Sequence, residues 1–107
     1  MEQTSILYLA TYPPRECGIA TFTRDLSSAI EKRFFPSIKS RILALNNNGT
    51  NIYNYPKKVI FQINDTEITD YLDAANKINR SKDIKLVNIQ HEFGIFGGDY
   101  GDFILPF

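Results

Sequence analysis

The chain has 107 residues, which is enough for one compact domain and too few for a second. Its twelve Lys and Arg residues balance twelve Asp and Glu residues, and 43% of its residues are hydrophobic, so composition argues against a disordered chain and against general nucleic-acid binding. The only cysteine, Cys17, cannot form an internal disulfide, and the N-terminal apolar run is too short for a signal peptide or a membrane span. We therefore expect a cytoplasmic protein with no integral membrane segment and no nucleic-acid partner.

The first elements are a buried strand and an amphipathic helix. Residues 5–11 form a nearly continuous apolar run that ends at Pro13 and Pro14, which predicts a central parallel strand. A helix is predicted from Gly18 to the residue before Pro36, because apolar residues recur at helical spacing. The apolar face predicted for this helix contains Ile19, Phe22, Leu26, Ala29, Ile30 and Phe34.

The remaining segments continue the alternation of strands and helices. Strands are predicted at residues 40–45, 58–63 and 84–90, with a polar turn cluster at 46–51. A second helix is predicted to begin after Asp65 or Thr66 as its N-cap, and its apolar positions are Ile68, Tyr71, Leu72, Ala75 and Ile78. The alternation predicts an α/β fold, a partial Rossmann-like domain with a mostly parallel sheet and flanking helices.

The loop after the first strand is the first candidate site. In open parallel sheets, ligands bind where strand ends meet helix N-termini, so the backbone amides of Gly18, Ile19 and Ala20 are candidate phosphate donors. The alternative is that Gly18 only makes a tight turn. Arg15 can contact a phosphate or an acceptor anion, or simply be solvated, and we take Cys17 as structural.

The loop after the last strand is the second candidate site. The only histidine, His91, can donate a hydrogen bond to a hydroxylated ligand there, or it can cap loop carbonyls. Glu92 adjoins it, and the glycines from Gly94 to Gly98, Gly97 among them, let this segment close over a sugar or make only a turn. No second histidine or spaced cysteine accompanies His91, so we expect no metal.

Two segments together resemble a known family. Residues 11–23 read TYPPRECGIATFT and residues 90–98 read QHEFGIFGG, and in this order they resemble bacterial glycosyltransferases of family four, the second segment a mannosyltransferase-like branch in particular. The resemblance covers almost the whole chain. It implies a retaining hexosyltransferase of the GT-B fold, in which the loop at Gly18 lies against the donor diphosphate. It also implies that His91 lies near the transferred sugar as the catalytic candidate, with Glu92 weaker; Arg15 and Gly97 remain possible sugar or acceptor contacts.

The resemblance also implies what this chain lacks. Residues 1–107 match only an incomplete N-terminal domain, and the C-terminal donor-binding domain is absent, so we expect the chain alone to be inactive. A complete enzyme would move a sugar, mannose in that branch, from a nucleotide-diphosphate sugar to a saccharide or lipid-linked acceptor. The missing domain or a partner chain would complete the enzyme. We expect it to use no metal and no other cofactor. The alternatives are a noncatalytic nucleotide- or glycan-binding module and a protein-interaction remnant.

Overall fold

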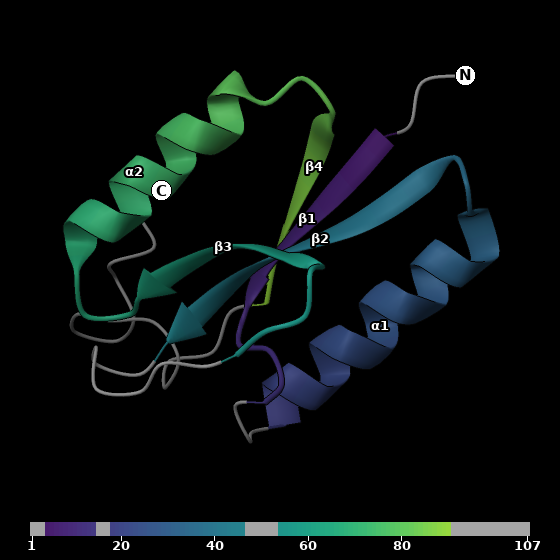
Figure 1. Cartoon of the computed structure of the whole chain (residues 1–107), viewed down its shortest axis with the longest axis horizontal. Helices are drawn as coiled ribbons and strands as arrows, with labels where there is room; N and C mark the ends of the chain where they lie inside the picture. The colour runs from purple at the N-terminus through teal and green to yellow at the C-terminus, as the bar shows by residue number, and fades with distance from the viewer. Residues whose placement is uncertain (1–3, 15–17, 47–53, 91–107) are drawn as a thin grey trace.

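The sheet is fully parallel and carries one helix on each face (Figure 1). The computed structural model describes residues 4–14, 18–46 and 54–90. The strand order is β3-β2-β1-β4, so β1 lies between two neighbours as predicted. The elements are β1 (Thr4–Ala10), α1 (Gly18–Phe34), β2 (Ile38–Asn46), β3 (Val59–Asn64), α2 (Ile68–Arg80) and β4 (Ile84–Ile89).

The register of the central strands aligns apolar residues across the sheet. Leu9 of β1 is opposite Leu43 of β2 on one side and Ile89 of β4 on the other. Parallel strands require a crossover between them, and α1 and α2 supply two of these crossovers. These features confirm the predicted α/β fold with its mostly parallel sheet and flanking helices, and the observed element bounds differ from the predicted ones by a few residues.

The face of the sheet that α2 covers holds the larger apolar core. Side chains alternate between the two faces of a strand, so every second residue of β1 and β2 points to this side. The buried residues of this cluster are Leu7, Leu9, Leu43, Leu45, Ile63, Tyr71, Ala74 and Ile78. Tyr71 and Ile78 confirm the predicted apolar stripe of α2, whereas Ile68 and Leu72 are about two-fifths exposed, at 42% and 41%.

The start of α2 differs from the prediction. Glu67, and not Asp65 or Thr66, occupies the N-cap position, and its side chain makes no capping hydrogen bond. Thr66 does not cap the helix, because its backbone amide and its hydroxyl both donate hydrogen bonds to Asn64 Oδ1, at 3.0 and 2.8 Å. A turn closed by the asparagine side chain therefore competes with the cap and moves the first helical residue to Ile68.

The face that α1 covers is packed differently. The sheet contributes buried Tyr8, Ile42 and Ala44, Tyr12 joins them from the segment after β1, and the residues of α1 that are buried are Ala20, Thr23 and Ser27. Leu26 and Ile30 are partly buried and pack against this cluster as predicted, whereas Phe22, Ala29 and Phe34 are exposed, so the predicted apolar face is wrong at these three positions. The large side chains of Tyr8 and Tyr12 fill this face, and α1 accordingly packs small side chains against them.

Hydrogen bonds satisfy the polar groups between α1 and β2. Thr23 Oγ1 donates to the carbonyl of Ile19 at 2.7 Å, and Ser40 Oγ donates to the carbonyl of Ser27 at 2.9 Å. β3 pairs with β2 only from Ile42 onward, so it offers no carbonyl to the Ser40 amide. The Ser40 amide donates instead to Glu31 Oε2 at 2.6 Å. The two bonds from Ser40 fix α1 on β2 by directional polar contacts.

Two buried tyrosines allow a matched test of hydroxyl burial. Tyr71 Oη donates to the carbonyl of Asp65 at 2.9 Å, whereas Tyr8 Oη is buried without a hydrogen-bond partner. We expect Tyr71→Phe to lower the free energy of unfolding by about 1 kcal/mol, and Tyr8→Phe to leave it unchanged or raise it, because an unpaired buried hydroxyl carries a desolvation cost. Urea unfolding of both variants measures the difference. An equal loss in both would contradict this assignment.

The start of β4 is tied to β1 through Asp83. Ser5 Oγ donates to Asp83 Oδ2 at 2.8 Å and Ser81 Oγ donates to Oδ1 at 2.9 Å, and these bonds hold the pKa of Asp83 below its ordinary value. A lowered folded-state pKa adds stability above the unfolded-state pKa, and this stability disappears as the pH falls through the folded-state pKa.

We therefore expect Asp83→Asn to reduce the loss of stability between about pH 5 and about pH 2. Thermal melts of both proteins across that range provide the measurement, and Asp73→Asn is the control because the Asp73 carboxylate is exposed on α2. If the melting temperature fell with pH by the same amount in the original protein and in the Asn variant, Asp83 would contribute nothing to acid sensitivity.

Candidate functional site

The carboxyl ends of the four strands lie at one edge of the sheet, and α1 begins at this edge (Figure 1). Gly18, Ile19 and Ala20 form the first turn of α1, so the structure brings the three predicted phosphate donors together. The first amides of a helix have no acceptor within the helix. Ala20 is fully buried and Ile19 packs against the core on the α2 side. At the helix start these two residues therefore offer their backbone and not their side chains to a ligand.

Gly18 is exposed, and nothing around it requires a glycine. A Cβ added there would have no described atom within 4 Å, and the backbone is not in the left-handed region that favours glycine. Packing and backbone conformation at Gly18 therefore give no support to a tight-turn role. Among the described residues the position of a Gly18 Cβ is open, which is what close approach of a ligand to the backbone needs.

The two helix N-termini at this edge differ in charge. The first turn of α1 has no acidic residue. The first turn of α2 carries Asp70, whose Oδ2 accepts a hydrogen bond from the Asn64 amide at 2.8 Å. A carboxylate at a helix N-terminus repels a second anion, so in the described part of the chain α1 provides the N-terminus suited to a phosphate.

A polar network at the same edge was not predicted. Tyr55 Oη donates to Asn46 Oδ1 at 2.6 Å, and Asn46 Nδ2 donates to Gln62 Oε1 at 3.1 Å. Asn46 is the last residue of β2, so its position at a strand end was a usable signal in the sequence. The bonds to Tyr55 and Gln62 depend on strand pairing, which the sequence pattern alone does not give.

The second predicted loop begins at the end of the strand next to β1. The backbone amide of Gln90 donates to the carbonyl of Leu9 at 3.0 Å, so β1 and β4 leave the sheet side by side. The predicted residues Arg15, His91, Glu92 and Gly97 lie outside the described residues, and their roles stay predictions. The adjacent strand ends mean that both predicted loops start from the same part of the edge.

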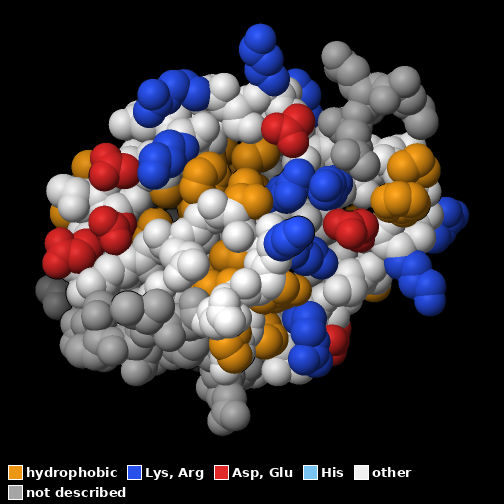
Figure 2. Space-filling model, in the orientation of Figure 1, with side chains coloured by type: hydrophobic (Ala, Val, Ile, Leu, Met, Phe, Trp, Pro, Cys, Tyr) orange, Lys and Arg blue, Asp and Glu red, His pale blue; other side chains and the backbone are white. Residues whose placement is uncertain are grey.

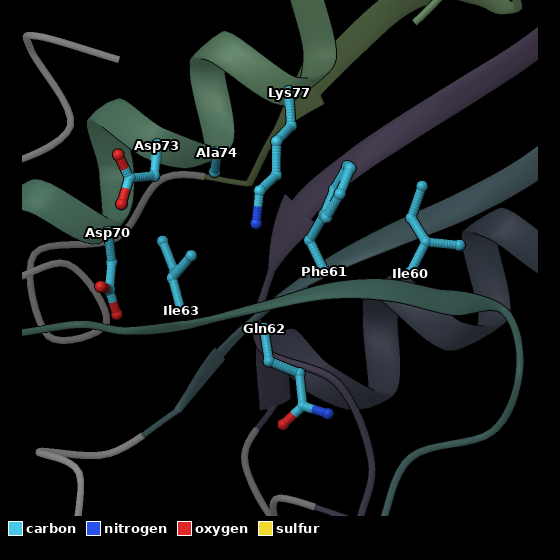
Figure 3. A pocket seen from close by; sticks show the side chains of 8 residues that line it. All are labelled: Ile60, Phe61, Gln62, Ile63, Asp70, Asp73, Ala74 and Lys77. Carbon is cyan, nitrogen blue, oxygen red and sulfur yellow. The ribbon is translucent and has the colours of Figure 1, made fainter.

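A hollow in the described part of the structure lies between β3 and α2 (Figure 3). Its volume is about 250 Å³, and it is lined by Ile60, Phe61, Gln62, Ile63, Asp70, Asp73, Ala74 and Lys77. Lys77 Nζ lies 6.0 Å from the centre of the Phe61 ring. Gly18, Ile19 and Ala20 do not line this hollow, so it is separate from the start of α1.

Two further features concern metals and membranes. Among residues 4–14, 18–46 and 54–90, no three His, Cys, Asp or Glu side chains gather closely enough to hold a metal ion. Neither α1 nor α2, the two helices of those ranges, has the length and hydropathy needed to cross a bilayer. The described site therefore consists of backbone amides and neutral polar side chains.

Comparisons of the chain with protein-family models, with curated proteins and with solved structures found no match. A fold of this class supports many unrelated functions. The functional argument consequently depends on the geometry at the carboxyl edge and on the two sequence segments that flank it.

Proposed function

We propose that this chain is the N-terminal, acceptor-side part of a retaining GT-B glycosyltransferase, and that the start of α1 holds the diphosphate of a nucleotide-sugar donor. The observation that carries the proposal is the open, acid-free first turn of α1 at the carboxyl end of the central strand. The sequence resemblance in residues 11–23 and 90–98 supplies the reaction class.

The chemistry of sugar transfer suits this arrangement. As the bond to the sugar breaks, negative charge accumulates on the departing diphosphate and the sugar becomes oxocarbenium-like. Amides already oriented by the helix can stabilise that charge without reorganising. Gly18, Ile19 and Ala20 would supply them, and no metal ion is needed for this role. His91 would contact the transferred sugar, with Arg15, Glu92 and Gly97 near the sugar or the acceptor.

A second domain or a partner chain would complete the enzyme. In the proposed reaction the donor is held between two domains, so this chain alone would bind a donor weakly and transfer nothing. The acceptor would be a saccharide or a lipid-linked glycan. The unpaired cysteine favours a reducing compartment, and we place the reaction in the cytoplasm.

Titration of the ¹⁵N-labelled chain with GDP-mannose and with UDP-glucose tests donor binding. We expect saturable amide shifts centred on Gly18, Ile19 and Ala20, and we expect the nucleoside diphosphate to compete while the free sugar does not. Shifts confined to other residues, or no saturable shift at all, would overturn the proposal. Donor binding without any transfer when a complete two-domain form is assayed would instead favour a noncatalytic binding module.

A further inference from the structure

A second hollow, of about 180 Å³, lies far from the carboxyl edge. It is lined by Glu31, Lys39, Ser40, Arg41, Lys57 and Lys58. Glu31 is near the C-terminal end of α1, thirteen residues beyond Gly18, and a helix rises 1.5 Å per residue, so about 20 Å separate the two positions along the helix axis. The hollow is therefore distinct from the proposed donor site.

The pairing of the strands creates this hollow. β3 pairs with β2 only from Ile42 onward, and the Ile42 amide donates to the carbonyl of Lys58 at 3.0 Å. The side of β2 before Ile42 has no neighbouring strand there, and the Ser40 amide donates instead to Glu31 Oε2. A notch remains between the start of β2, the residues that lead into β3, and α1.

The charges around the notch are unbalanced. Four basic residues and one acidic residue line it, so the lining residues carry an excess of positive formal charge. Within the described ranges none of the four cations makes a direct ion pair, although Glu31 acts on Lys58 and Arg41 acts on Asp83 at longer range. Figure 2 shows Lys and Arg side chains across the middle of the face that it draws, with Asp or Glu side chains among them. The notch therefore has a local excess of positive charge in a chain whose formal net charge is zero.

The groups deeper in the notch are partly withdrawn from water. Burial lowers the pKa of Lys58 and the Glu31 charge opposes that shift, while Lys58 Nζ donates a long hydrogen bond of 3.4 Å to Ser28 Oγ. Burial raises the pKa of Tyr8, whose hydroxyl lies near Ser40 and Glu31. A cation that is partly desolvated and makes no direct ion pair gains more from an added anion than a fully solvated one.

We propose that this notch binds the phosphate group of a phosphate-bearing anion, at a site separate from the start of α1. An arginine fork and mobile lysine ammonium groups are the side chains that recognise phosphate oxygens. The volume is below the range of pockets that enclose a whole small-molecule ligand, and it suits a phosphate or diphosphate group. The phosphate can belong to a free small molecule or to a lipid headgroup.

The test uses the whole chain labelled with ¹⁵N and titrated with inorganic phosphate and with pyrophosphate at constant ionic strength. We expect saturable shifts at the amides of Ser40, Arg41 and Lys58. The double variant Lys39→Gln with Lys58→Gln should bind pyrophosphate about tenfold or more weakly. The control removes the same charge with Lys82→Gln and Lys85→Gln, two exposed lysines near the start of β4, and should bind as the original chain does.

Sedimentation with vesicles separates the two sources of phosphate. Vesicles of phosphatidylcholine with phosphatidic acid are compared with vesicles of phosphatidylcholine alone. Binding to the acidic vesicles that the Lys39 and Lys58 variant loses identifies a lipid headgroup, and binding of pyrophosphate alone identifies a free phosphate compound. Equal behaviour of the two double variants, or no saturable binding to either probe, overturns the proposal. For each double variant, amide signals of residues away from the notch that match those of the original chain verify that the variant is folded.

Discussion

Leu43→Ala is expected to lower the free energy of unfolding by about 2–5 kcal/mol. Leu43 lies in β2, has no exposed surface, and is opposite Leu9 in β1 and Phe61 in β3. Truncation removes buried apolar contacts and leaves a cavity under α2, because strands on both sides prevent collapse of the site. A domain of this size has only about 5–15 kcal/mol of stability, so the variant should be close to unfolding. Urea unfolding at 25 °C measures the change.

The control for this substitution is Leu86→Ala in β4. Leu86 is also a strand leucine, but 56% of it is exposed, so its truncation should change stability by no more than about 0.5 kcal/mol. The comparison separates cavity formation from any general effect of alanine in a strand. If both variants lost the same stability, the assignment of the core to the α2 side would be wrong.

Gly18→Val is expected to weaken binding of a nucleotide-diphosphate sugar by about tenfold or more, which corresponds to about 1.4 kcal/mol. The valine side chain would fill the open space where the phosphate must approach the amides of Ile19 and Ala20. Stability should not fall, because valine has a higher helix propensity than glycine and the added atoms meet no described atom within 4 Å. Amide titration and urea unfolding give the two readouts.

Thr21→Val is the matched control for the glycine substitution. Thr21 is exposed on the first turn of α1 and has almost the shape of valine, so this variant adds a valine to the same turn without filling the space at Gly18. We expect its donor binding to be close to that of the original chain. Equal weakening in both variants would show that the effect comes from the turn as a whole and not from the glycine.

The sequence predicted those parts of the fold that depend on local pattern. The apolar run of residues 5–11 predicted a central strand, and β1 has neighbours on both sides. The sheet-facing residues of α1 were not predictable in the same way, because apolar spacing favours Phe22 and Phe34 over Thr23 and Ser27. Thr23 can be buried because its hydroxyl bonds the helix itself, and the Ser27 carbonyl meets a serine from a strand thirteen residues later.

The candidate site was predictable to a similar extent. A glycine between a predicted strand and a predicted helix identified the start of α1. In a parallel sheet such a turn lies at the carboxyl ends of the strands, where ligands bind. The network of Tyr55, Asn46 and Gln62 depends on the pairing of β2 with β3, and the notch near Ser40 depends on where that pairing begins. Both follow from strand register, which apolar periodicity does not specify.

The contrast between the two faces of the sheet has a consequence for mutational tolerance. Under α2 the contacts are apolar and nondirectional, so exchanges among aliphatic residues of similar volume should be accepted there. Under α1 the helix is close to the sheet through Ala20, Thr23 and Ser27, and Ser40 fixes it with two hydrogen bonds. A library of random substitutions should therefore keep a narrow set of small residues at these helix positions, while aliphatic residues of similar volume replace one another in the opposite core.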